Sequence, residues 1–137
     1  MKKKILLIDD EPFEADLMRR ALKKVGLESS LVYFQHAEDA IEYLQKTEDD
    51  ALVIFCDMNM PRMNSREFKK RINADEYLRK KSIPFIFYSS SASAKEVEEA
   101  FENNAQGFFN KAQEQSELVE IIEAVVHYWT RSRHPNN

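Results

Sequence analysis

The sequence has 137 residues, of which 43% are hydrophobic and 32% charged, a composition typical of one globular domain with a single core. The net charge of −4 gives no basic surface for nucleic acid, and no apolar run approaches the roughly 20 residues of a membrane-spanning helix. A single cysteine, Cys56, rules out an internal disulfide and a cysteine-rich metal site. We therefore expect a cytoplasmic protein that binds neither nucleic acid nor a membrane.

Apolar runs typical of strands alternate along the chain with segments whose apolar side chains recur at helical spacing. In chain order the prediction is strand 5–8, helix 12–25, strand 30–34, helix 37–46, strand 52–56, helix 64–72, strand 84–88, helix 93–103, strand 107–110 and helix 116–129. Residues 73–82 are polar and fit a helical extension followed by a loop. Ser93 with Glu96 has the spacing of a capping box, and Ser116 is the expected N-cap of the last helix.

A strand followed by a helix, repeated five times, predicts an α/β fold in which a doubly wound, five-stranded parallel sheet is flanked by five helices. The strand at residues 52–56 is apolar throughout, as expected for a strand buried on both faces. No linker or second composition divides the chain. We therefore expect a single domain over residues 1–137, with a core at about 4–130 and a polar tail at 131–137.

Polar side chains follow four of the predicted strands. Asp9 and Asp10 follow the first strand, Asp57 the third, Ser89 the fourth and Lys111 the fifth. Because the carboxyl ends of parallel strands lie at one edge of the sheet, we expect these side chains to converge.

Carboxylates held close together repel one another, so either one is protonated or a cation lies between them. Oxygen ligands without a cluster of histidine or cysteine favour Mg²⁺ over Zn²⁺. Such a set is suited to phosphoryl transfer: an aspartate can form an aspartyl-phosphate, while Lys111 and Ser89 contact phosphate oxygens.

These residues resemble the receiver domain of two-component response regulators, in order and spacing, from about Lys4 to Trp129. The motifs that carry the resemblance are Asp9-Asp10, Asp57, Met60-Pro61, Ser89 and Lys111. The resemblance implies the flavodoxin-like receiver fold with strand order 2-1-3-4-5.

The resemblance also implies roles for the acidic residues. Asp57 would be the phosphoacceptor, taking a phosphoryl group from a phosphohistidine. Asp10, Asp57 and the backbone carbonyl of Asn59 would bind Mg²⁺, and Asp9 would act through water.

Other implied roles concern the phosphate and the switch. Lys111 would pair with the phosphate, Ser89 would be the switch hydroxyl and Phe108 the aromatic switch residue. The chain departs from the family at three positions: Ala112 stands where proline is usual after the lysine, Ser65 where glycine is frequent, and Ser90 where alanine is usual. Because a cis peptide before a non-proline residue costs about 2.5–4 kcal/mol, we expect a trans Lys111–Ala112 peptide and a shifted loop.

The resulting hypothesis is a signalling switch that catalyses only its own phosphorylation and dephosphorylation. Its expected partners are a sensor histidine kinase or histidine phosphotransfer protein and a downstream protein, and it would be a monomer or a weak homodimer. One alternative is a receiver-like docking scaffold that acts without phosphorylation. A small phosphohydrolase is disfavoured because no second acid stands two residues after Asp57.

Overall fold

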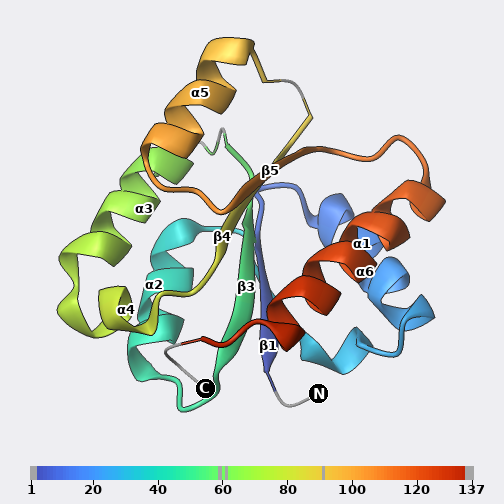
Figure 1. Ribbon diagram of the computed structural model, residues 1–137, viewed down its shortest axis with the longest axis horizontal. Helices are drawn as coiled ribbons and strands as arrows, with labels where there is room; N and C mark the ends of the chain where they lie inside the picture. Colours follow the sequence, from blue (N-terminus) through green and yellow to red (C-terminus); the bar gives the residue numbers. More distant parts are fainter. Residues whose placement is uncertain (1–2, 59, 61, 91, 135–137) are drawn as a thin grey trace.

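The computed structural model describes residues 3–58, 60, 62–90 and 92–134, and shows a central sheet with helices on both faces (Figure 1). The strands are β1 (Lys4–Ile8), β2 (Leu31–Phe34), β3 (Ala51–Cys56), β4 (Phe85–Ser89) and β5 (Gly107–Asn110). The helices are α1 (Pro12–Lys24), the 3-10 helix η1 (Glu28–Ser30), α2 (Ala37–Lys46), α3 (Ser65–Ala74), α4 (Glu76–Lys81), α5 (Ala94–Glu102) and α6 (Gln115–Arg131).

The sheet has five parallel strands in the order β2-β1-β3-β4-β5. This arrangement confirms the expected doubly wound topology and strand order. It places β1 and β3 side by side at the centre, with Ile8 opposite Cys56 in register. The segments that follow these two strands therefore begin next to each other at the carboxyl edge of the sheet.

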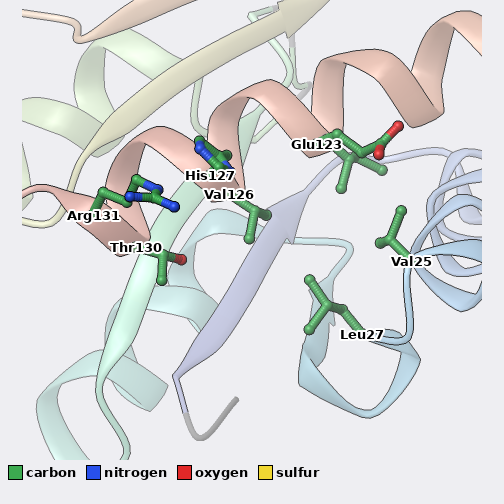
Figure 2. A pocket seen from close by; sticks show the side chains of 8 residues that line it. Val25, Leu27, Glu123, Val126, His127, Thr130 and Arg131 are labelled. Carbon is green, nitrogen blue, oxygen red and sulfur yellow. The ribbon is translucent and has the colours of Figure 1, made fainter.

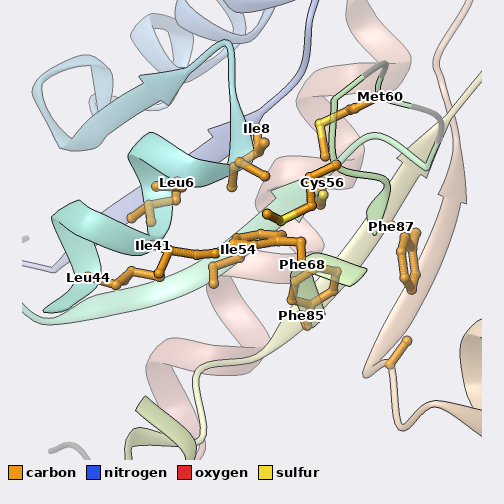
Figure 3. Packing of buried hydrophobic residues seen from close by; sticks show 14 of the residues in the cluster. Leu6, Ile8, Ile41, Leu44, Ile54, Cys56, Met60, Phe68, Phe85 and Phe87 are labelled. Carbon is orange, nitrogen blue, oxygen red and sulfur yellow. The ribbon is translucent and has the colours of Figure 1, made fainter. Parts of the chain in front are cut away.

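Two apolar cores lie on opposite faces of the sheet. Helices α1 and α6 cover one face, and α2 to α5 cover the other (Figure 1). Strand β3 is buried along its whole length: Ile54 and Cys56 belong to the core under α2 to α5, whereas Val53 and Phe55 belong to the core under α1 and α6. Figure 3 shows the first of these cores, where Phe68 of α3 packs against Phe85 of β4 with ring centroids 5.6 Å apart.

The expected number of five flanking helices is wrong, because the described residues form six α-helices and one 3-10 helix. The segment 73–82 contains the end of α3 and a separate short helix, α4. Asp75 separates the two: its backbone is extended, its side chain accepts the Leu78 N–H as the N-cap of α4, and its other oxygen accepts Gln45 Nε2 at 3.0 Å. No helix in the described part of the chain is long and apolar enough to cross a membrane.

The predicted helix starts were right in one case and wrong in another. Ser93 and Glu96 form the expected capping box, in which each side chain accepts the other residue's N–H. Helix α6 instead begins at Gln115 with Glu114 as its N-cap, so Ser116 lies inside the first turn. Just before the helix, the Glu117 side chain accepts the Gln113 N–H at 3.1 Å, a contact that supports this earlier start.

Candidate functional site

Three carboxylates meet at the carboxyl edge of the two central strands. Asp9 follows β1 and Asp57 follows β3, and the Asp57 N–H extends the ladder by donating to the Ile8 carbonyl at 2.9 Å. One carboxylate oxygen from each of Asp9, Asp10 and Asp57 lies within 4.8 Å of the other two. The sequence therefore predicted correctly that these three acids are brought together.

The environment of this cluster changes the pKa of Asp57. Its side chain is only 12% exposed, and the pKa of its carboxyl is raised from 3.8 to about 6. Burial is the largest cause and the charges of Asp9 and Asp10 contribute to the rise, whereas Lys111 and the Met58 N–H oppose it. The protein thus holds an anion where negative charge is already concentrated, which is the environment that a bound cation relieves.

Lys111 supplies the positive charge of the site. It follows β5, and its N–H donates to the Ser89 carbonyl at 2.8 Å. Its Nζ lies 2.8 Å from Asp9 Oδ2 and 3.7 Å from Asp57 Oδ1. Burial alone would lower the pKa of Lys111, but the Asp9 hydrogen bond and the surrounding carboxylates raise it, so the ammonium stays charged.

Glu14 is a fourth acid at the site that the sequence reasoning missed. Its Oε1 lies 3.7 Å from Lys111 Nζ, and its side chain is 18% exposed. Burial raises the pKa of Glu14, and the charges of Asp9 and Glu11 add to the rise. The sequence did carry a signal, because the helix after Asp10 must start at the same edge of the sheet, and Glu14 is in its first turn.

Two tyrosines whose contacts the sequence did not predict form hydrogen bonds with the backbone beside the site. The Tyr33 hydroxyl donates to the backbone carbonyl of Asp9 at 2.7 Å. The Tyr88 hydroxyl accepts the Ala112 N–H at 3.0 Å. Proline at position 112 would have no backbone N–H. Alanine has one, and the Tyr88 hydroxyl accepts it.

The departures from the family pattern at Ala112 and Ser65 are accommodated in the structure. The described residues contain no cis peptide, which confirms the expected trans bond between Lys111 and Ala112. Ser65 is fully buried, and its hydroxyl donates to the Met58 carbonyl at 3.0 Å. Ser65 is not among the described residues with positive φ, and Asn64 before it has φ −73°, so this turn does not require glycine.

The methionines around Asp57 pack inward. Met58, Met60 and Met63 are each at most 7% exposed and belong to the core under α2 to α5. Figure 3 shows Met60 above Cys56 and Ile8. This burial favours loop packing over a docking surface for these residues.

The structure also places the predicted switch residues. Ser89 is the last residue of β4, is 2% exposed and lies opposite Asn110 of β5. Phe108 is half-buried on β5, with its ring 5.7 Å from that of Phe87. Asn59, the expected backbone ligand for Mg²⁺, lies outside the described residues.

The residues at this edge fit a hard divalent cation such as Mg²⁺. Clustered oxygen donors from Asp9, Asp10 and Asp57 match the ligand preference of Mg²⁺. Burial first, and the charges of Asp9 and Asp10 after it, raise the pKa of Asp57, and a cation bound beside its carboxylate would favour the ionised form. By contrast, a depression of about 550 Å³ between α6 and the chain after α1 is lined by residues such as Val25, Leu27 and Val126 and includes none of these acids (Figure 2).

A parallel sheet of this order, with clustered carboxylates and a lysine at its carboxyl edge, defines the receiver class of signalling domains. The chain belongs to the response regulator receiver domain family, which it matches over residues 5–123. It is 29% identical over 125 residues to the chemotaxis protein CheY1 of Helicobacter pylori, covering 90% of this chain and 96% of that one. It is 24% identical over 129 residues to a probable methanogenesis regulatory protein, FilR2, of Methanothrix harundinacea, covering 91% and 82%.

Solved structures show the same fold. The phosphorylated cyanobacterial phytochrome response regulator RcpA superposes with a TM-score of 0.83 at 22% identity, covering 98% of this chain and 99% of that one. At this level of identity the likeness concerns the fold alone.

Proposed function

We propose that this chain is a phosphorylation-switched protein of a two-component system, in which Asp57 accepts a phosphoryl group from a histidine kinase or histidine phosphotransfer protein. The observation that carries the proposal is the position of the Asp57 carboxylate, within 4.8 Å of Asp9 and Asp10 oxygens and 3.7 Å from the Lys111 ammonium. The residues proposed as nucleophile, metal ligands and countercharge thus lie together at one edge.

The proposed chemistry follows from this geometry. An Asp57 oxygen attacks phosphorus, the bond from phosphorus to the histidine nitrogen breaks, and the imidazole nitrogen keeps the bonding pair. With a pKa of about 6, Asp57 is mainly ionised at neutral pH and is able to attack. Asp10, Asp57 and the Asn59 carbonyl would hold Mg²⁺, with Asp9 acting through water, and the ion would neutralise charge on the phosphoryl oxygens.

Lys111 is positioned for the product as well as the reaction. Asp9 holds its Nζ at 2.8 Å, on the side of the site that faces Asp57. A phosphoryl group on Asp57 would add oxygens that can accept from this ammonium.

The switch would run through β4 and β5. The Ser89 carbonyl accepts the Lys111 N–H, so the two strand ends are joined directly beside the acidic cluster. In the proposed active state, the Ser89 hydroxyl contacts the phosphoryl group and Phe108 moves further inward. The altered surface then docks to a downstream protein.

Ala112 and Ser65, where the chain departs from the family, are the residues that favour the alternative of a phosphorylation-independent scaffold. Each now has a specific partner, the Tyr88 hydroxyl and the Met58 carbonyl respectively. These contacts preserve the site around both substitutions and thereby favour the switch.

The decisive experiment treats the protein with acetyl phosphate and Mg²⁺ and measures intact mass and thermal unfolding. The switch predicts one labile phosphoryl adduct that requires Mg²⁺ and is absent from Asp57→Asn. The matched control is Asp49→Asn, which removes an exposed loop carboxylate and should leave the adduct intact. Mg²⁺ alone should raise the melting temperature of the unmodified protein by ligand linkage. No adduct and no response to Mg²⁺ would support the scaffold instead, and rapid turnover of a generic phosphate ester would support a hydrolase.

A further inference from the structure

Lys69 of α3 has a largely buried side chain and no countercharge among the described residues. It is only 8% exposed, although neighbouring Lys70 is exposed. Among the described residues, Lys69 Nζ has no hydrogen-bond or ion-pair partner, and its one polar contact is with the Phe85 ring, whose centroid lies 5.1 Å away. Burial accordingly lowers the pKa of this lysine.

Lys69 is mostly covered by protein, although its Nζ keeps some contact with solvent. An ammonium that loses part of its hydration with no acid beside it is unfavourable, and the contact with the Phe85 ring offsets only part of that loss. An anion bound against Lys69 would remove this imbalance.

Lys69 lines a depression of about 450 Å³ formed by α3, α4, the start of β4 and the chain between α5 and β5. This depression lies away from the acidic cluster, at the opposite ends of the strands. Its buried wall is apolar and includes Ile54, Leu78 and Phe85. No aspartate or glutamate is among the residues that line it, so no part of the described lining neutralises Lys69.

Polar side chains at the mouth complete the site. Asn73 and Arg79, both exposed, lie at the rim, and their side chains have no hydrogen-bond partner within the described residues. Gln106 has a different role, because it accepts the Phe85 N–H at 2.7 Å and donates to the Asn104 carbonyl at 2.9 Å. Gln106 thereby fixes the loop that forms one side of the depression.

We propose that this depression binds a small organic carboxylate, with its carboxylate on the Lys69 ammonium and its hydrocarbon body against Phe85 and Leu78. The single ammonium of Lys69, with its stem buried, matches a single negative charge, and the apolar wall matches an aliphatic or aromatic body. Arg79 and Asn73 can add hydrogen bonds at the rim. The proposal is independent of the phosphoacceptor site.

The test is a titration of the full chain, labelled with ¹⁵N, with benzoate, using neutral benzamide and inorganic phosphate as comparison probes. Benzoate should cause saturable shifts in the amide signals of Asn73, Asn104 and Gln106. Because hydrogen bonds to charged groups contribute about 1.5–3 kcal/mol, benzoate should bind at least about tenfold more tightly than benzamide. Lys69→Met should weaken benzoate binding to the same extent, whereas the matched Lys70→Met should leave it unchanged.

The comparison probes make the result decisive. Equal binding of benzoate and benzamide to the unmodified protein would overturn the role of Lys69 without any need for a variant. Tighter binding of phosphate than benzoate would overturn the carboxylate class. Absence of saturable shifts with benzoate, or unchanged benzoate binding by a folded Lys69→Met protein, would overturn the proposal.

Discussion

Replacing Asp57 with asparagine is expected to make the protein more stable at neutral pH, although it removes the proposed phosphoacceptor. The native fold raises the pKa of Asp57 from 3.8 to about 6, through burial first and then through the charges of Asp9 and Asp10. Between these two pH values the native state binds more protons than the unfolded state, so the stability contributed by Asp57 falls as pH rises.

The size of the effect follows from the same shift. About two pKa units at 1.36 kcal/mol each give a cost of about 3 kcal/mol for the ionised carboxylate at about pH 7.5. Asparagine carries no charge, and its side-chain oxygen can still accept the Met58 N–H. Asp57→Asn should therefore raise the free energy of unfolding by up to about 3 kcal/mol at this pH. The gain should shrink to about 1 kcal/mol at about pH 4.5, where native Asp57 is largely protonated.

The assay is urea unfolding in the presence of a metal chelator at several pH values. Asp49→Asn serves as the control, because its carboxylate is exposed and its replacement should change stability by no more than about 0.5 kcal/mol. An Asp57→Asn protein no more stable than the unmodified one at neutral pH would refute the reasoning. A gain of the same size at both pH values would also refute it.

Three further predictions concern single contacts, each measured by urea unfolding. Lys111→Met should lower the free energy of unfolding by about 3–5 kcal/mol, because it leaves the buried Asp9 carboxylate without its ion-pair partner. Lys46→Met breaks only the exposed ion pair with Glu42 and should lower the same free energy by less than about 1 kcal/mol. Tyr88→Phe keeps the ring beside Phe55 but removes the acceptor for the Ala112 N–H. It should lower the free energy of unfolding by about 1–3 kcal/mol and speed hydrogen exchange at the Ala112 amide. Unchanged exchange would contradict the hydrogen bond from Ala112 to Tyr88. Ser93→Ala should lower the free energy of unfolding by about 1 kcal/mol, because it removes the capping box of α5. Ser116→Ala should change this free energy little, because Ser116 is not the N-cap of α6; equal losses for the two variants would contradict the start of α6 at Gln115.

Local sequence patterns were enough to predict that the acidic residues lie together at one edge of the sheet. Apolar runs that end on Asp9 and Asp57 indicate strands that open at one edge, and the alternation with helices requires those strands to be parallel. The convergence of Asp9, Asp10 and Asp57 follows from that pattern, because the pairing of the strands in the sheet fixes where the residues at the strand ends lie. The capping box at Ser93 was also predictable, since it involves residues only three apart.

The tertiary structure decided which side chains from distant segments actually touch. The hydrogen bond between Tyr88 and Ala112 depends on the spacing of segments far apart in the chain, which no local pattern encodes. The sequence places Glu14 near the sheet edge, but only the orientation of α1 brings its side chain to Lys111. The same is true of the Asp75 contact with Gln45, which accompanies the break between α3 and α4, and of the burial of Lys69. The sequence by itself determined that carboxylates meet at the sheet edge, because strand ends are a local property. Only the packed fold determined how Lys111 contacts them and that Lys69 is largely buried, because those outcomes depend on distances between segments far apart in the chain.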